Sequence, residues 1–482
     1  MNIIAGNIVA ESAPRTKKLA EGVAAAIVRD VMAMGWPVGG SVGSMQDLLS
    51  RHGVSHAVLR EAVRQIEQNG LAVMRRGAGG GLVVAKRPGD VAAQALATYA
   101  QLVDIYVREL IAARFLFEDA MVRAVSLRMT AADATRLRVL GADLADGQLP
   151  EIELIVRYNR LSTLLSEIAD NPLLTVMNKL AFRALTPALA RADPARLAQT
   201  IEPGSGPAFV RRWKGIIEAL ISDDPAAAIE ILHAARPGIE ESTVQRAAER
   251  RRQAQAGAAT LIATEILEAV DESRGRKHSQ LVALSIARNI AANGWPEGHH
   301  LGLEPALLAE YQVSRNIFRE AARILEVHGV CAAKRGQRGG FIVGRPRPDY
   351  AVETAVASLR FLGLEPYHVG EARLAIQPSL AALCAASDGR AVATLAAAVA
   401  GGDAAGAARR FLEALGPASE NRALALVNAV LLGVEDPGLP LKSTSEAGAE
   451  VVGAALAAIR AHDQPLARRI VLDLCRMDHP DV

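Results

Sequence analysis

Apolar residues recur every four positions in one short stretch of the chain. Val58, Ala62 and Ile66 form an apolar stripe, while Arg60 and Arg64 lie on the opposite side of the same helical pattern. The spacing therefore predicts an amphipathic helix with one buried face and one basic face.

The same stretch occurs a second time, 259 residues further along the chain. When Gly35 is aligned with Gly294 and Val84 with Val343, no gap is needed and 20 of 50 positions are identical. Similarity over this length predicts an internal duplication, so each structural unit is expected twice.

Shorter elements surround each predicted helix. Ser55 and Ser314 stand where an N-cap residue is expected. They follow short apolar helices, at helix-turn-helix spacing, and precede a basic glycine-rich turn between two short apolar runs. Those runs, which end in Leu82-Val83-Val84 and Phe341-Ile342-Val343, predict a two-stranded hairpin in each copy.

Another helix is predicted at the start of each copy. Val23, Ile27 and Val31 share one face, and Gly35-Trp36-Pro37 ends the pattern, as Gly294-Trp295-Pro296 does in the second copy. Each tryptophan is expected to pack in the core or at a hinge and not to serve as a ligand platform.

A helix-turn-helix followed by a basic hairpin is a winged helix, and this sequence resembles the GntR family of bacterial transcription regulators. Both copies match the signature Val-Ser-Arg-x-x-Val-Arg-Glu-Ala-Leu-x-x-Leu-Glu-x-x-Gly-Leu with a basic glycine-rich wing. His56 replaces the signature arginine that is kept as Arg315, and Gln46 or Pro305 replaces the arginine usual in the preceding helix. The resemblance implies that double-stranded DNA is the partner and that it is faced by Ser55, His56, Arg60, Arg64, Arg75, Arg76, Gly77, Gly79, Ser314, Arg315, Asn316, Arg319, Arg323, Lys334, Arg335, Gly336, Arg338 and Gly339.

The basic helix faces and the glycine-rich turns each have another possible explanation. Arginines on a helix often form only a solvated face, but cap, hairpin and repeat here all agree with DNA binding. The glycine-rich turns lack the Gly-Lys-Ser/Thr ending of a phosphate loop.

Beyond Pro88 the pattern changes to long helical stretches without wings. Apolar residues at three- and four-residue spacing predict helical stretches over Val103–Met129, Glu151–Ile168, Leu173–Leu189 and Val210–Leu232, interrupted by turn signals such as Asp170-Asn171-Pro172 and Asp223-Asp224-Pro225. They resemble the FCD-type effector domain of the fatty-acid-regulator branch of the GntR family, through Arg114-x-x-Phe117-Glu118, Asp170-Asn171-Pro172-Leu173 and Ile216-Ile217-Glu218-Ala219-Leu220. The second copy repeats these landmarks at shorter spacing, with Arg373-x-x-Ile376-Gln377, Glu420-Asn421 and Ala458-Ile459.

The expected fold is mainly α with small β wings. Two winged helix-turn-helix domains, at 1–88 and 276–348, are each followed by an all-α helical-bundle effector-type domain, at 89–248 and, shortened, at 349–482. A linker that carries one helix is expected at 249–275. Its basic run either touches phosphate or is a solvated connector.

Most FCD domains hold a divalent metal through one Asp and up to three His. Here the resemblance places those ligands on Tyr158, Ser162, Trp213 and Ala235 in the first copy, and on Ala408, Leu412, Val452 and Leu474 in the second. No metal or other cofactor is therefore expected. A small organic effector is a candidate for an apolar cavity lined by Arg114, Tyr158 and Trp213, with Arg373 as the second-copy equivalent of Arg114. The alternative is that these side chains fill the space that the metal leaves.

Composition sharpens the expected function. A net charge of +2 in 482 residues means that affinity for DNA must come from local basic clusters. Cys331, Cys384 and Cys475 form no Cys-x-x-Cys pair, as in free thiols of a reducing compartment. No run reaches the roughly 18 apolar residues of a membrane helix, so a cytoplasmic protein is expected.

The motifs favour binding over catalysis. No nucleophile motif, His-Glu-x-x-His or paired carboxylates are found, so enzymatic activity, for example in a helical bundle with accessory DNA-binding units, is not expected. We expect a transcription regulator in which one chain acts as a pseudo-dimer and occupies an operator with both winged units, with further homo-oligomers allowed. The alternative is an effector-sensing or scaffold protein with degenerate DNA-binding units, which the departures at His56, Gln46 and Pro305 would fit.

Overall fold

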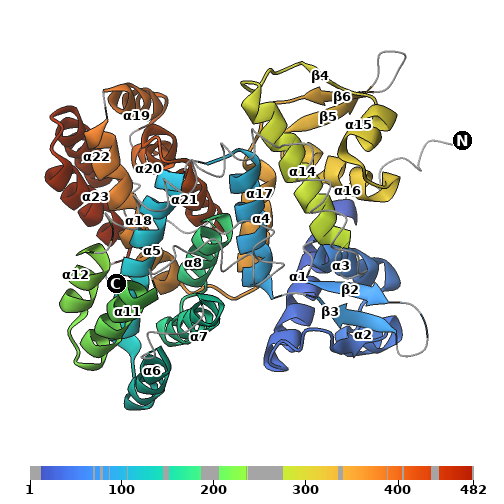
Figure 1. Ribbon diagram of the computed structural model, residues 1–482, viewed down its shortest axis with the longest axis horizontal. Coiled ribbons are helices and arrows are strands. Elements are labelled where there is room, and N and C mark those ends of the chain that lie inside the picture. Colours follow the sequence, from blue (N-terminus) through green and yellow to red (C-terminus); the bar gives the residue numbers. More distant parts are fainter. Residues whose placement is uncertain are drawn as a thin grey trace, which may run out of the picture. The chain divides into compact units, whose positions relative to one another are not determined.

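The computed structural model describes residues 12–68, 71–75, 77, 80–85, 87–105, 107–144, 151–185, 206–234, 236, 275–334, 340–387, 389–403, 406–435 and 445–479. Helices dominate this part of the chain, with short strands in two small sheets (Figure 1). The chain divides into two compact units, Met1–Ala93 with Thr354–Leu364, and Gln94–Glu353 with Glu365–Val482.

The first unit contains the first winged unit, residues 12–84. Its elements are α1 (Ser12–Ala33), β1 (Ser41–Gly43), α2 (Met45–His52), α3 (His56–Gln68), β2 (Ala72–Arg75) and β3 (Gly81–Val84). The strands form an antiparallel sheet in the order β1-β3-β2. The predicted hairpin is confirmed as β2 and β3. Strand β1 was not predicted, because three residues are too few to show an alternating pattern.

The predicted apolar stripe of α3 lies in the core of the first winged unit. Val58, Ala62 and Ile66 are all buried there, together with the stripe of α1 and with Trp36, which is 8% exposed. The core role predicted for Trp36 is therefore confirmed. Phe361, far along the chain, packs against the same cluster.

The second winged unit, residues 275–343, has the same order of elements. These are α14 (Gly275–Ala292), β4 (His300–Gly302), α15 (Glu304–Tyr311), α16 (Arg315–Val327), β5 (Cys331–Lys334) and β6 (Gly340–Val343), with sheet order β4-β6-β5. Phe318, Ala321 and Leu325 of α16 are buried in its core. The Trp295 indole Nε1 donates a hydrogen bond to the Gly344 carbonyl oxygen at 3.0 Å.

Strands β3 and β6 each start with a glycine that no other residue could replace without a shift of the backbone. Gly81 and Gly340 have φ values of 144° and 129°. A Cβ atom on Gly81 would lie 2.5 Å from the carbonyl oxygen of Gly43, and one on Gly340 would lie 2.6 Å from that of Gly302. The repeated glycines are thus explained by the close approach of β1 to β3 and of β4 to β6.

Two connector helices follow the winged units, α4 (Pro88–Leu102) and α17 (Asp349–Arg360). Leu102, at the end of α4, is 1% exposed and lies in the core of the second winged unit. The residue 259 positions later is Phe361, which packs on the core of the first winged unit. Each winged core is therefore completed by a residue from the other copy.

The predicted helix Val103–Met129 was wrong at its start. Asp104 takes a left-handed backbone conformation, with φ of 48°, and the Ile105 N–H closes the end of α4 on the carbonyl oxygen of Ala100 at 3.0 Å. The next helix, α5, begins only at Val107.

Two helical bundles make up much of the second unit (Figure 1). The first bundle consists of α5 (Val107–Arg128), α6 (Ala131–Leu144), α7 (Glu151–Ala169), α8 (Pro172–Leu185), α11 (Gly206–Ile221) and α12 (Pro225–Ala234). The second bundle consists of α18 (Pro366–Ala386), α19 (Arg390–Ala400), α20 (Ala407–Ala418), α21 (Arg422–Val434), α22 (Glu446–Arg460) and α23 (Gln464–Asp478).

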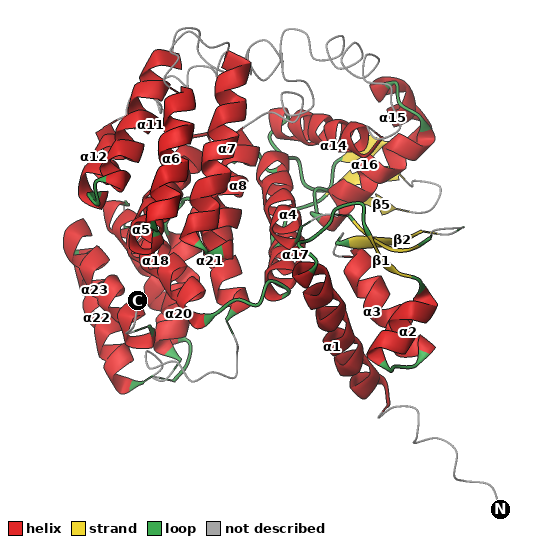
Figure 2. Cartoon of the chain, turned by 90° about the horizontal axis from the view of Figure 1, so that it is seen from below, coloured by secondary structure: helices red, strands yellow, loops and turns green. Residues whose placement is uncertain are grey.

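The second bundle is shorter in the elements that the spacing of the landmarks indicated. Helix α20 has 12 residues where α7 has 19, and α19 has 11 where α6 has 14. The two bundles lie against each other, with α5 beside α18 (Figure 2), α21 against α5, and α8 against α18.

Candidate functional site

Helices α3 and α16, which are the predicted recognition helices, present basic faces to solvent. In α3, His56, Arg60 and Arg64 are exposed on the side opposite the buried stripe. The Ser55 hydroxyl accepts a hydrogen bond from the Val58 N–H at 3.4 Å, as the cap prediction requires. In α16, Ser314 caps the helix in the same way, with its hydroxyl 3.4 Å from the Ile317 nitrogen.

The basic face of α16 is organised by a carboxylate that the sequence reading missed. Arg315 and Arg319 are both 63% exposed, and each directs its Nε to the same oxygen, Oε1 of Glu304, at 3.2 and 3.4 Å. Glu304 is the first residue of α15, so it holds two arginines that are predicted to face DNA side by side across the helix-turn-helix. Asn316 and Arg323 are also exposed on α16.

The first winged unit arranges its arginines differently. Met45 stands at the position of Glu304, and the Arg60 Nε donates to the His56 carbonyl oxygen at 3.3 Å. Arg64 is bound by Glu61 within its own helix, with N–O distances of 3.0 and 2.5 Å. The hydrogen bond to Glu61 raises the pKa of Arg64, which stays charged.

The wings are described only at their bases. Arg75 and Lys334 are exposed at the ends of β2 and β5, and Gly77 has φ of 105°. The other residues predicted in the wings lie outside the described part of the chain: Arg76, Gly79, Arg335, Gly336, Arg338 and Gly339.

A glutamate on each of helices α3 and α16 binds the strand that leads into the wing. The Glu67 carboxylate accepts a hydrogen bond from the Met74 N–H at 2.7 Å, and that of Glu326 accepts one from the Ala333 N–H at 2.9 Å. Sequence reasoning assigned these residues no role, although their repetition at the same position in both copies was an available indication. They tie the strand at the base of each wing to the helix, and helix and wing are expected to meet DNA together.

A histidine lies behind the second recognition helix. His328, which follows α16, is 3% exposed and packs between the rings of Tyr99 and Tyr350, with centroids 5.9 and 5.2 Å away. Burial lowers the pKa of His328 to about 4, so the ring is neutral at physiological pH. Tyr99 belongs to α4, which connects the first winged unit to the first bundle.

The residues predicted for an effector cavity lie in both bundles. In the first bundle, the Arg114 Nε lies 2.8 Å from the Glu118 carboxylate, and Trp213 is buried, with the Arg212 guanidinium 5.4 Å from its ring centroid. Tyr158 lies on α7, but its side chain is outside the described residues. A cavity between these residues stays a prediction.

Arg373, the second-copy equivalent of Arg114, lies in the second bundle, where it is fully buried. Its Nη1 lies 3.1 Å from Glu435 and 3.2 Å from Asp478, and its Nε donates to Gln377 at 3.0 Å. Burial, opposed by the nearby Arg373 charge, raises the pKa of Glu435. Arg373 thus holds the end of α23 in place and, with no exposed surface, lines no open pocket.

The positions that the resemblance assigned to metal ligands are apolar in the second bundle. Ala408, Leu412, Val452 and Leu474 are each at most 1% exposed, and in the first bundle Trp213 is 3% exposed. Among the described residues, no three His, Cys, Asp or Glu side chains lie close enough together to hold a metal ion. Apolar side chains have no lone pairs to offer a cation, so these positions do not fit the metal of the family.

Comparison with known proteins identifies one segment of the chain. Residues 109–235 match the model of the FCD domain family, and this range covers α5 to α12 of the first bundle. No curated protein matches the chain. A GntR structure from Streptococcus agalactiae is similar at 16% identity and a TM-score of 0.33, over 46% of this chain and 99% of that one. Within the described residues, no helix combines the length and apolar character needed to cross a membrane.

Proposed function

We propose that this chain, a GntR-type transcription regulator with an FCD domain at residues 109–235, binds its operator as a single-chain pseudo-dimer. The observation that carries the proposal is the presence of two winged units that each expose a basic, serine-capped helix. An operator with two half-sites normally requires two winged units, which other regulators obtain by dimerisation. Here one chain supplies both, so the second contact is intramolecular.

Each predicted domain is assigned one role in this proposal. Residues 1–88 and 276–348 bind DNA, and 89–248 and 349–482 form effector-type domains, joined by the linker at 249–275. The first of these, which contains the FCD match, is the one we assign to a small organic effector, because Arg373 of the second is occupied by Glu435 and Asp478.

The two halves should read DNA unequally. Arg315 can offer two parallel hydrogen bonds to a guanine edge, whereas His56 at the same position of α3 cannot. Arg315→Ala should therefore weaken operator binding by about 1–3 kcal/mol and relax the preference at one base position. His56→Ala should cost less, and the preferred operator should be an imperfect palindrome.

Capture of genomic fragments by the purified protein, followed by footprinting and binding titrations, tests the proposal. We expect one motif with two unequal half-sites, one chain per operator by light scattering, and a larger loss for Arg315→Ala than for His56→Ala. Arg468→Ala, which removes an exposed arginine from α23, is the matched control and should leave binding unchanged. Two chains on a minimal operator, a perfectly symmetric motif or equal losses would each overturn the corresponding part. Absence of any motif would favour the scaffold alternative.

A further inference from the structure

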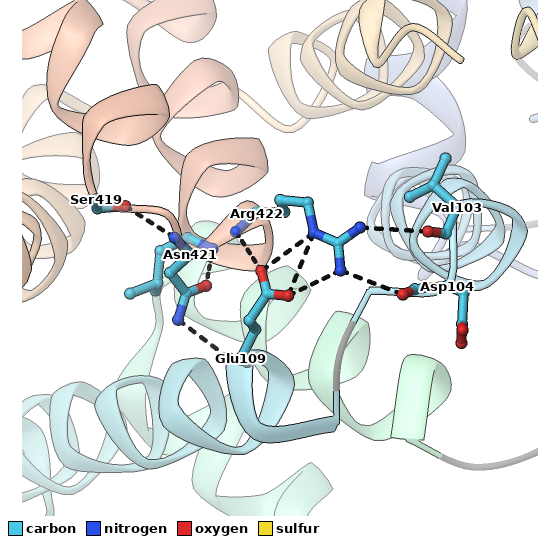
Figure 3. A network of polar contacts seen from close by, with 7 residues as sticks. Val103, Asp104, Glu109, Ser419, Asn421 and Arg422 are labelled. Carbon is cyan, nitrogen blue, oxygen red and sulfur yellow. Dashed lines mark hydrogen bonds and ion pairs between the residues drawn. The ribbon is translucent and has the colours of Figure 1, made fainter. Parts of the chain in front are cut away.

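Two asparagines that cap helices of the two bundles also join the bundles to each other. The Asn171 Oδ1 caps α8 by accepting from the Leu173 and Leu174 N–H groups, while its Nδ2 donates to the His368 carbonyl oxygen in α18 at 3.0 Å. Asn421 caps α21 in the same manner, and its Nδ2 donates to the Glu109 carbonyl oxygen in α5 at 3.3 Å (Figure 3).

These contacts are reciprocal. Glu109 and His368 are 259 residues apart and are both the third residue of their helix, and Asn171 and Asn421 both directly precede theirs. The same patch of each bundle therefore contacts the same patch of the other, which is the arrangement of an isologous two-fold interface. With backbone contacts alone, either bundle would pair equally well with a copy of itself.

The charged contacts at this interface are not reciprocal. On one side, the Glu109 carboxylate accepts from the Arg422 backbone N–H at 2.6 Å and from its guanidinium Nη2 at 2.8 Å (Figure 3). That guanidinium also donates to the Val103 and Asp104 carbonyl oxygens, at 3.3 and 3.2 Å, where α4 ends. It is thus held by main-chain groups as well as by a carboxylate that is only 12% exposed.

A different pair stands on the other side. Arg128 of α5 forms an ion pair with Glu371 of α18, and the second Glu371 oxygen accepts from the Asn171 Nδ2 at 2.9 Å. The Glu371 side chain is 13% exposed. His368 completes this side, with its ring Nδ1 accepting from the Glu365 N–H and its Nε2 2.9 Å from the Asp170 carbonyl oxygen.

The residues at the equivalent positions decide what a like pair would contain. If a first bundle paired with another first bundle, Glu109 would face Pro172 in place of Arg422. In the same pair, Arg128 would face Ala112 in place of Glu371. If a second bundle paired with another second bundle, Arg422 would face His368 in place of Glu109, and Glu371 would face Ser387 in place of Arg128. In each like pair, Glu109 with Arg128 or Glu371 with Arg422 would thus lose the partners that the other bundle supplies in this chain, which is costly for carboxylates that are only 12 and 13% exposed.

We infer that the surface between the bundles selects the unlike partner: each bundle fits the other bundle of the chain and rejects a second copy of itself. Specificity of this kind is a difference between two affinities, and here it comes from the two ion pairs that the like pairs would lack. This selectivity favours pairing of the two bundles within one chain. It disfavours pairing of a bundle with the same bundle of a second chain. It does not depend on DNA binding.

The intact protein allows a direct test. A protease site is inserted between Ala254 and Gln255, the folded protein is cut, and isotopically labelled and unlabelled cut protein are mixed and allowed to exchange halves. Native mass spectrometry then counts like and unlike pairs. We expect unlike pairs to exceed like pairs by about tenfold or more, whereas pairing without selectivity would give roughly equal amounts of each. A combined E109A/R422A/R128A/E371A variant should approach that unselective ratio.

The matched control is R136A/E167A, which removes an ion pair with both side chains 54% exposed in the first bundle and should leave the selectivity unchanged. Like pairs as frequent as unlike pairs in the wild type, or full selectivity in the four-residue variant, would overturn the inference. If the cut protein unfolds, the uncut chain decides it: E109R and R422E should each lower the melting temperature, and the double variant should recover at least part of the loss. Additive losses would count against the inference.

Discussion

Replacing Leu102 by Ala should destabilise the second winged unit, although Leu102 belongs to the first copy of the repeat. Leu102 ends the connector helix α4, which follows the first winged unit in the sequence, yet its side chain is 1% exposed in the core of the second winged unit. Phe361 is the equivalent residue behind α17 and packs on the core of the first winged unit. The two substitutions should therefore have crossed effects.

The magnitude follows from the burial of the side chain. Truncation of a fully buried leucine removes its transfer free energy and leaves a cavity, which together cost about 2–5 kcal/mol. A loss of about 3 kcal/mol in the local opening free energy should speed hydrogen exchange roughly 100-fold. Exchange monitored by mass spectrometry should show this acceleration in peptides of α14 and α16 for Leu102→Ala. For Phe361→Ala it should appear in peptides of α1 and α3.

The control is Leu127→Ala, which alters a leucine that is 79% exposed on α5 and should leave exchange in both winged units unchanged. The reasoning is refuted if Leu102→Ala accelerates exchange in α1 and α3 and leaves α14 and α16 protected. That result would mean that each connector completes the core of its own copy.

Three further outcomes are expected. Glu304→Gln should tighten binding to unrelated duplex DNA about fivefold, because two exposed ion pairs of roughly 0.5 kcal/mol each no longer compete for Arg315 and Arg319. Anisotropy titrations check this, with the exposed Glu310→Gln as control, and unchanged or weaker binding contradicts it. His328 has a pKa of about 4 in the folded chain against an ordinary 6.5, so the unfolded chain binds the proton more readily and stability falls as the pH drops through this interval, by roughly 3 kcal/mol at most. Urea midpoints at pH 7.5 and 4.5 should differ less for His328→Phe, and an equal difference in both proteins would disprove it. A chelator should not change the melting temperature, since Ala408, Leu412, Val452 and Leu474 occupy the positions aligned with metal ligands; stoichiometric metal lost together with stability would show that alignment to be wrong.

The sequence by itself determined the local elements of this protein. The four-residue spacing of Val58, Ala62 and Ile66 was enough for α3 and its buried face, and the serines before α3 and α16 were enough for their caps. These features depend on neighbours within one or two helical turns, so periodicity and capping chemistry reveal them. The same holds for the basic face of each recognition helix and for the resemblance that led to the FCD domain.

Only the tertiary structure decided which distant residues meet. Leu102 reads as the apolar end of a helix in its own copy, and nothing in the pattern says that it completes another core. Asn171 and Asn421 are only landmarks of a resemblance in the sequence, and the fold shows that each bonds to the other bundle. The pairs Glu109–Arg422 and Arg128–Glu371 join residues that nothing in the sequence connects. Arg373 was assigned to an effector cavity because its position matches Arg114, but the fold brings Glu435 and Asp478 to its guanidinium. Periodicity records which face of a helix is buried; what that face is buried against depends on long-range packing, which a single sequence does not encode locally.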